Sequence, residues 1–285
     1  MNNYQFAYGD GTVTLPLEGC NILGELHGNK VEPIKDIRTA LWGSLDEPIG
    51  SEALCKRVKA GNTVALIVSD MSRFWMRQDL VVPHLVDYLT QRCGVQEADI
   101  SIVIANGTHE GGDEQELRTL VTDAVYDRVR VENHDCEATD LVYLGTTPHG
   151  TPVSINRTAA QADIVICLGA VTHHVMAGFG GGRKSILPGI SSRETIFHNH
   201  AFSLDAAQLR SNPAIGNGVL KGNPLHEDMC EAAGLVKNLF IINLVMNAQM
   251  QLAAIFSGHY LSSWEQACRT VDTIYQVDIP AKADV

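Results

Sequence analysis

The sequence predicts an α/β fold in which helices flank a mostly parallel sheet. Short, continuous apolar runs at 62–70, 99–107, 161–169 and 239–245 are typical of strands that are buried on both faces. A stretch with helical spacing of apolar residues, 78–92, separates the first two runs. Strands that alternate with helices favour parallel pairing, because each crossover returns the chain to the same end of the sheet.

Each predicted helix has its own signal. The stretch 78–92 carries one apolar stripe, made of Leu80, Val81, His84, Leu85, Tyr88 and Leu89. Acidic residues open the segment 113–120, and carboxylates stabilise a helix N-terminus. Ser191 and Glu194 have the spacing of a capping box, which predicts another helix start.

Composition limits the classes of function. The chain has 285 residues and a formal net charge of −12, which argues against general affinity for nucleic acid. Its most apolar stretch, 239–246, is too short to span a bilayer, and residues 1–12 lack the pattern of a signal peptide. The 7 cysteines are dispersed and form no CxxC pair, so we expect reduced thiols and a cytoplasmic protein.

Polar residues follow three of the predicted strands. Asp70 ends the first run, His109 follows the second, and His173 and His174 follow the third. The carboxyl ends of parallel strands meet at one edge of a sheet, where ligands of such folds gather. The sequence therefore predicts a polar ligand site at that edge.

Two of these positions have both a chemical and a plain explanation. Arg73 can bind a carboxylate or phosphate through parallel N–H groups, with Asp70 to orient it, but a helix cap beside an exposed arginine explains the same residues. An imidazole at His109 or His174 can act as acid or base near neutral pH, yet each also fits an ordinary loop histidine.

A glycine-rich run, 172–185, is the most informative segment. Glycines let the main chain approach a bulky ligand, and Lys184 adds an amine directly after them. Arg183 occupies the position where a phosphate-binding P-loop needs glycine, and it also breaks the dinucleotide-binding pattern. The run therefore predicts a cofactor site of another kind, or a flexible loop.

The helix predicted after Ser191 carries a candidate metal ligand. Ile196, Phe197 and His200 lie on one side of it at spacings of three and four, so His200 shares a face with core anchors. His198 points elsewhere, which disfavours a chelate with His200. No HExxH pattern or carboxylate-rich set indicates zinc hydrolysis.

Taken together, these motifs resemble the nickel-dependent lactate racemase family. The resemblance rests on Ser-Asp-Met-Ser-Arg (69–73), Asn-Gly-Thr-His (106–109), the run 174–185 and Asn-His (199–200), and it continues through Lys-Gly-Asn-Pro-Leu-His (221–226). It implies an α/β N-terminal lobe of a two-lobe protein that racemises or epimerises a small 2-hydroxy acid by reversible hydride transfer.

The resemblance also implies a cofactor and its attachment. Members of the family use a nickel-pincer nucleotide derived from nicotinic acid, for which Lys184 matches the covalent anchor and His200 the nickel ligand. A square-planar site of two sulfurs, one carbon and one nitrogen suits Ni(II). The cofactor is made by maturation enzymes, which are the implied protein partners.

By the same resemblance, His109 and His174 are the paired acid/base residues and Arg73 binds the substrate carboxylate. Asp70 and Ser72 are expected near the cofactor phosphate or bracing the arginine. We expect residues 1–280 to form the lactate-racemase-like domain and 281–285 to begin a truncated C-terminal lobe. The alternative is a binding module that holds a nicotinate-derived nucleotide or another anion without turnover.

Overall fold

The computed structural model describes residues 3–279 and 281–283. The longer strands are β1 (Asn3–Tyr8), β2 (Gly11–Pro16), β3 (Val64–Ser69), β4 (Ile100–Ala105), β5 (Arg130–Asn133), β6 (Val142–Thr146), β7 (Pro152–Ile155), β8 (Ile164–Ala170), β13 (Leu239–Met246) and β14 (Leu252–Gly258). Four strands of two residues are β9 (His173–His174), β10 (Gly178–Phe179), β11 (Leu204–Asp205) and β12 (Arg210–Ser211).

The α-helices are α1 (Ile37–Asp46), α2 (Leu54–Arg57), α3 (Val82–Gln91), α4 (Glu114–Val121), α5 (Asp123–Tyr126), α6 (Arg157–Gln161), α7 (Arg193–Ala201), α8 (Pro224–Gly234) and α9 (Ser262–Tyr275). Short 3₁₀ turns lie at Met71–Met76, Gln78–Leu80, Glu97–Asp99 and Gly182–Ser185.

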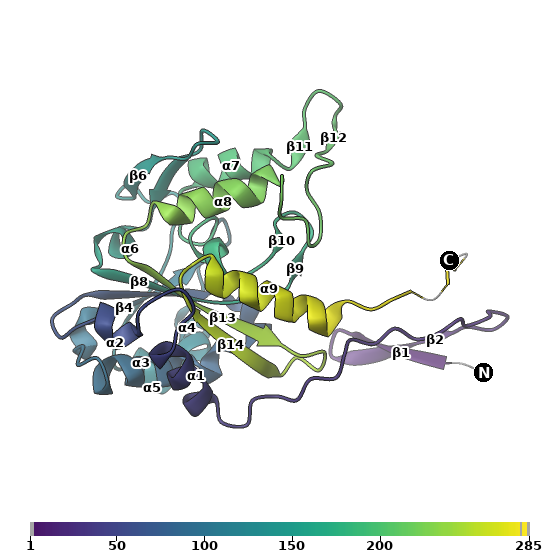
Figure 1. The fold of residues 1–285 in the computed structure, drawn as a ribbon, viewed down its shortest axis with the longest axis horizontal. Coiled ribbons are helices and arrows are strands. Elements are labelled where there is room, and N and C mark those ends of the chain that lie inside the picture. The colour runs from purple at the N-terminus through teal and green to yellow at the C-terminus, as the bar shows by residue number, and fades with distance from the viewer. Residues whose placement is uncertain (1–2, 280, 284–285) are drawn as a thin grey trace.

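A six-stranded sheet in the order β14-β13-β8-β3-β4-β5 forms the centre of the molecule. Its strands pair in parallel except for β14, which runs antiparallel to β13. Helices α1 to α5 lie on one side of the sheet, and α6, α7 and α8 lie on the other (Figure 1). The predicted α/β class with a mostly parallel sheet is confirmed.

Both faces of the sheet are buried, which explains the continuous apolar runs. Along β3, Leu66 faces a core cluster shared with α1 and α3, whereas Ile67 faces a second cluster shared with α8. Successive strand residues point to opposite faces, so a strand covered on both sides needs apolar residues throughout. A third cluster, around Trp264, packs α9 beside β13.

Leu66→Ala should lower the free energy of unfolding by about 2–5 kcal/mol, because the Leu66 side chain has no exposed surface and its removal leaves a cavity in the core. Urea titration monitored by circular dichroism measures the change. Leu204→Ala is the matched control, since Leu204 is 65% exposed and should change stability by about 0.5 kcal/mol or less. Equal losses in both variants would contradict the assignment of the core.

The chain order creates a crevice at one edge of the sheet. From β3 the chain proceeds outward to β4 and β5 and then returns to β8, on the other side of β3. The connections that leave β3 and β8 therefore diverge. Ligands of open α/β sheets bind beyond the carboxyl ends of strands at such a point.

Two predicted details differ from the structure. The stretch 78–92 begins with a 3₁₀ turn, and α3 itself starts at Val82 with Pro83 in its first turn, so Leu80 is partly exposed rather than in the core. Residues 284–285, part of the expected start of another lobe, lie outside the described residues.

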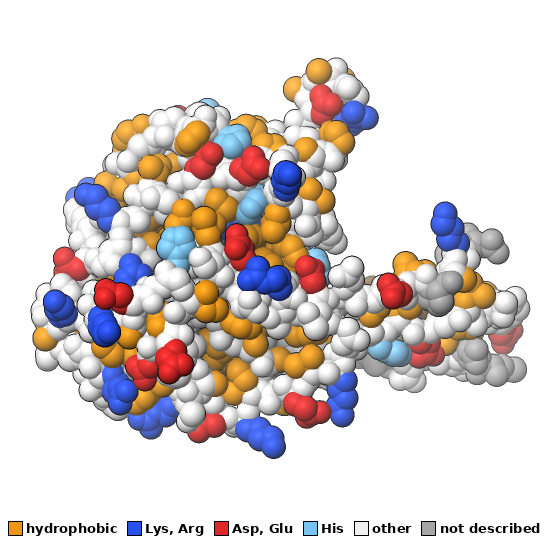
Figure 2. Space-filling view, in the orientation of Figure 1, with side chains coloured by type: hydrophobic (Ala, Val, Ile, Leu, Met, Phe, Trp, Pro, Cys, Tyr) orange, Lys and Arg blue, Asp and Glu red, His pale blue; other side chains and the backbone are white. Residues whose placement is uncertain are grey.

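The hairpin β1–β2 projects from the body of the molecule (Figure 1). Its cross-strand pairs Tyr4–Leu15 and Phe6–Val13 place apolar side chains on the hairpin, and hydrophobic surface on this projection is visible in Figure 2. The sequence motifs did not predict this hairpin. Among the described residues, no helix is both long and apolar enough to cross a membrane.

Candidate active site

A cavity of about 410 Å³ lies beyond the carboxyl ends of β3, β4 and β8, at the crevice defined by the strand order. Six of the seven residues predicted for the site line it: Asp70, Arg73, His109, His174, Lys184 and His200. They come from four of the sequence motifs, 69–73, 106–109, 174–185 and 199–200. The fold thus brings the separate motifs to one space.

The turn after β3 forms a hydrogen-bonded chain that ends on Arg73. Arg73 donates from Nη1 to Ser72 Oγ over 2.9 Å, and Ser72 donates to Asp70 Oδ1 over 2.6 Å. Ser72 does not line the main cavity but faces a neighbouring cavity of about 390 Å³. Its observed contacts fit the expectation that Ser72 and Asp70 brace the arginine.

Asp70 has a second partner that the sequence motifs did not indicate. Its Oδ2 lies 2.5 Å from Nδ1 of His109, and the carboxylate is only 13% exposed whereas the imidazole is 53% exposed. A carboxylate accepts hydrogen bonds, so Nδ1 of His109 carries a proton, and in the neutral form of the ring Nε2 has the lone pair. The pair therefore presents a base.

His174 lies on the β9–β10 hairpin and is half-buried. Its Nδ1 accepts hydrogen bonds from the backbone N–H groups of Met176 and Ala177, at 3.2 and 3.1 Å. Burial, together with the positive charges of Lys184 and Arg183, lowers the pKa of His174 to about 4. The ring is therefore neutral at physiological pH.

The glycine run is ordered by contacts with the rest of the protein. Gly182 has a φ of 53°, and a Cβ on it would lie 2.7 Å from Cδ1 of Trp264. Gly181 has a φ of 67°, and a Cβ there would lie 2.7 Å from Val171. These two glycines are therefore explained by the packing of the loop, rather than by the approach of a ligand that the sequence suggested.

The side chain of Arg183 stabilises this loop through hydrogen bonds to its backbone. Its guanidinium is fully buried, donates to three carbonyl oxygens of residues 177–180 at 2.8 to 3.4 Å, and lies 3.9 Å from the ring centre of Trp264. Its Nε donates to Nδ1 of His226 over 3.2 Å. Within the part of the chain that the structure describes, no carboxylate forms an ion pair with Arg183, so its charge acts on the site above it.

Lys184 is one of the groups affected by the charge of Arg183. Burial, then the positive charges of Arg183 and Arg73, lowers the pKa of the Lys184 amine to about 7. A large fraction of the amine is then uncharged at neutral pH. An uncharged amine is the nucleophilic form, which suits a lysine that forms a covalent bond.

His200 lies on α7, which begins after an N-cap at Ser192 whose side chain accepts from Thr195 N–H. The capping signal was therefore one residue early, because Ser191 is buried and donates to Ile186 O instead. Nδ1 of His200 lies 3.0 Å from the carbonyl oxygen of Ile196, so that Nδ1 donates and Nε2 is free to bind a metal.

The prediction that Phe197 anchors α7 in the core is wrong. Ile196 is buried, but Phe197 is 57% exposed and lines the cavity beside His200. Burial, then the charge of Lys184, lowers the pKa of His200. The neutral imidazole is the form that binds a metal ion.

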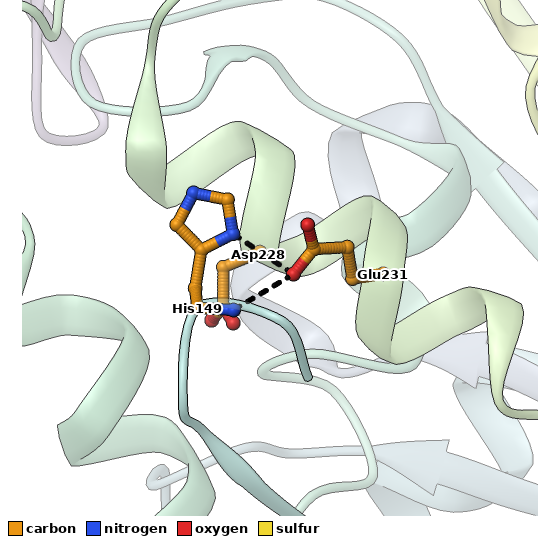
Figure 3. A group of neighbouring side chains, drawn as sticks. All are labelled: His149, Asp228 and Glu231. Carbon is orange, nitrogen blue, oxygen red and sulfur yellow. Dashed lines mark hydrogen bonds and ion pairs between the residues drawn. The ribbon is translucent and has the colours of Figure 1, made fainter. Parts of the chain in front are cut away.

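A separate group of potential metal ligands lies away from this cavity. His149, Asp228 and Glu231 place one ligand atom each within 4.8 Å of the others (Figure 3). Several of their polar atoms already have protein partners, because both oxygens of buried Asp228 accept hydrogen bonds from Thr147, Thr151 and Asn199, and His149 Nδ1 lies 2.8 Å from Glu231. The group is thus explained as a link that joins the β6–β7 turn to α7 and α8.

This link should give stability a dependence on pH. The hydrogen bond to Glu231 raises the pKa of His149. A group whose pKa is raised by folding stabilises the protein below its unfolded pKa of about 6.5, and the contribution disappears as pH rises through the folded-state value. The free energy of unfolding of the parent minus that of His149→Gln should therefore be larger at pH 6 than at pH 9, as measured by urea titration. A pH-independent difference would contradict the charged pair.

Sequence reasoning missed one contact, between Asp70 and His109, and one buried residue, Arg183, in this region. No local motif joins Asp70 to His109, because the two residues belong to different strand ends and meet only in the folded sheet. Arg183 was noted only as the residue that breaks two other motifs. An arginine within an otherwise small and apolar run was a signal of burial that could have indicated its scaffold role.

The fold and cavity define an α/β protein with a ligand site at the switch point of a parallel sheet. A model of the lactate racemase N-terminal domain matches residues 8–211. The chain belongs to this family, which confirms the resemblance found in the sequence.

Named relatives support the assignment. The lactate racemase of Thermoanaerobacterium thermosaccharolyticum is 30% identical over 283 residues, covering 98% of this chain and 64% of the relative. That of Lactiplantibacillus plantarum is 30% identical over 277 residues, covering 95% and 62%. The chain thus spans a little under two thirds of the length of these relatives.

Solved structures agree with the fold. The apoprotein structure of the Thermoanaerobacterium lactate racemase has a TM-score of 0.83 and 30% identity, covering 96% of this chain and 63% of that one. A Thermotoga maritima protein, 23% identical over 84% of this chain and 58% of its own, has a TM-score of 0.62 and shares the fold.

Proposed function

We propose that this chain carries the catalytic residues of a racemase or epimerase of small 2-hydroxy acids. The observation that supports this most strongly is the convergence of Arg73, His109, His174, Lys184 and His200 on one cavity. Membership of the lactate racemase family supports the same reaction class. Lactate itself is one candidate within the substrate class.

Two of the side chains have properties suited to the substrate. The Arg73 guanidinium is accessible and braced by Ser72, so it can bind a carboxylate. Nε2 of His109 can take the proton of the 2-hydroxyl group, and Asp70 stabilises the imidazolium that results. The O–H bond breaks as the N–H bond forms, and the proton returns to oxygen in the reverse step.

The donor set of the cavity fits the family's nickel-pincer nucleotide. The cavity volume of about 410 Å³ lies in the range of small-molecule and cofactor sites. Lys184 offers a largely uncharged amine for covalent attachment, and Nε2 of His200 offers one nitrogen to nickel. The chemistry that the bound group supplies is the reversible acceptance of a hydride, so the protein residues need to handle only the carboxylate and the proton.

The proposal also covers the protein partners and the cellular location. Enzymes that make and load the nickel-pincer nucleotide are the partners that such a site requires. All 7 cysteines are free thiols, which supports a cytoplasmic location.

Chiral chromatography tests the proposal. The loaded protein should interconvert the enantiomers of at least one acid in a panel of small 2-hydroxy acids, and Arg73→Met should raise the KM by removing the carboxylate partner. Covalent loading without any interconversion across the panel would reject the enzyme and support the alternative of a binding module.

A further inference from the structure

Gln78 is a buried polar side chain to which the proposed reaction gives no role. Both polar atoms of its amide bind the backbone of one residue, Ser69, at the carboxyl end of β3. Ser69 N–H donates to Oε1 over 3.1 Å, and Nε2 donates to Ser69 O over 2.7 Å. The amide has only this orientation, because Oε1 cannot donate and Nε2 cannot accept. The side chain has no exposed surface, so both hydrogen bonds are shielded from water.

The pairing of the sheet explains why Ser69 needs this partner. β3 pairs with β4 as far as Ser69 and Ala105, but it pairs with β8 only as far as Ile67 and Cys167. The cavity lies beyond the point where β3 and β8 stop pairing. Buried backbone groups are almost always paired. The Gln78 amide therefore takes the place that a further residue of β8 would fill, and the crevice stays open.

The same two hydrogen bonds close the loop 70–77 at its base, since Ser69 precedes this loop and Gln78 follows it. The loop carries three residues of the predicted site, and hydrogen bonds fix them relative to one another: Asp70, Ser72 and Arg73. The bonds between Gln78 and Ser69 fix the two ends of the loop relative to the sheet, because Ser69 is still paired with β4.

The backbone at Arg77 brings Gln78 within reach of Ser69. Arg77 has a φ of 53°, in the left-handed region that residues other than glycine seldom adopt. Its guanidinium donates to both carboxylate oxygens of Asp79, over 3.0 and 2.8 Å. The chain therefore turns sharply at Arg77, and this turn places the amide of Gln78 against the end of β3.

We infer that Gln78 is a positioning residue: its amide fixes the direction in which the chain leaves β3, and so places Asp70 and Arg73 in the cavity. This inference rests on the proposed function for the reaction that these residues serve, but its basis is the hydrogen bonding at Ser69. Gln78 does not line the cavity, so it acts through the loop 70–77. A displacement of about 1 Å in such groups can lower a rate about 10²-fold.

Hydrogen exchange tests the inference without any need for activity. In Gln78→Met, a side chain of similar length has no amide, so Ser69 loses both hydrogen bonds. Backbone amides in peptides that cover 69–77 should exchange about tenfold faster than in the parent, as measured by mass spectrometry. Unchanged exchange at 69–77 in this variant would overturn the inference.

A matched control separates this local effect from a general loss of stability. Asn247 is also a buried amide that binds backbone, since its Nδ2 donates to Val31 O over 2.9 Å, but it lies outside the cavity. Asn247→Leu should leave exchange at 69–77 as in the parent. An equal acceleration at 69–77 in Asn247→Leu would show that the loop responds to any loss of stability, and would reject the specific role of Gln78.

Kinetic constants per loaded site test the consequence for the reaction. The fraction of protein with an adduct on Lys184 counts the sites, so a smaller folded fraction does not alter kcat. Gln78→Met should load as the parent does but lose about 10²-fold in kcat/KM, through a higher KM and a lower kcat. Gln78→Asn keeps an amide that is one methylene shorter, and it gives the same expected loss should Gln78→Met fail to fold. Asn247→Leu should keep both constants.

The two experiments separate this inference from the proposed function. Faster exchange at 69–77 in Gln78→Met, with no racemisation by the loaded parent protein, would reject the 2-hydroxy-acid racemase and leave Gln78 as the residue that positions the loop. Racemisation by the parent, with unchanged kcat and KM in loaded Gln78→Met, would overturn the inference and leave the proposed function in place.

Discussion

Protein with Lys184→Ala, purified from cells that make the nickel-pincer nucleotide, should show no mass beyond that of its polypeptide. The parent protein from the same cells should carry a covalent adduct. The expected loss is complete, because we propose the amine of Lys184 as the attachment atom and its pKa of about 7 makes it nucleophilic near neutral pH. Intact-protein mass spectrometry measures the adduct.

A matched control separates attachment from a general loss of lysine. Lys237 is exposed and lies outside the cavity, so Lys237→Ala should load as the parent does. Retention of the adduct in Lys184→Ala would reject Lys184 as the anchor. Arg183→Met offers a further check, since removal of its charge should shift the loading reaction to higher pH by raising the pKa of Lys184.

His109→Ala should lower the rate of racemisation by about 10²–10⁴-fold, the range expected for the loss of a general base. Asp70 positions the proposed base, because its carboxylate accepts the hydrogen bond from Nδ1–H and leaves Nε2 free. Steady-state assays with each enantiomer measure the loss. Circular dichroism checks that the variant is folded, which we expect because His109 is more than half exposed.

Asp70→Asn tests whether the hydrogen bond from His109 to Asp70 keeps His109 in the form that acts as a base. The amide has nearly the shape of the carboxylate but can donate to Nδ1, which would move the ring proton to Nε2 and remove the base. We expect a fall in kcat comparable to that of His109→Ala, and a double variant that is no worse than either single one. Additive losses would show that Asp70 and His109 act independently.

The sheet could be predicted from the sequence because a strand that is buried on both faces needs a continuous run of apolar residues. The runs that became β3, β4, β8 and β13 are mostly apolar, and the carboxyl ends of β3, β4 and β8 lead into polar residues of the cavity. Topology then required those ends to meet. This is why six predicted site residues from distant motifs line one cavity.

The remaining features depend on contacts that have no local sequence signal. The tautomer of His174 follows from the turn of the β9–β10 hairpin, which brings two N–H groups to Nδ1. The packing of the glycine loop depends on Trp264, which lies about 80 residues further along the chain. The motif for α7 indicated a helix start but placed its cap one residue early, since Ser191 and Ser192 both suit that position locally.

Under the proposed function, the cavity beyond β3, β4 and β8 holds the nickel-pincer nucleotide. Anomalous diffraction at the nickel edge, from crystals of the loaded protein, tests it most directly. We predict a nickel peak within bonding distance of Nε2 of His200, and a weaker peak in His200→Ala, where only the donors of the cofactor remain. A peak instead at His149, Asp228 and Glu231, or loaded crystals with no nickel near His200, would show that this cavity is not the site of the metal.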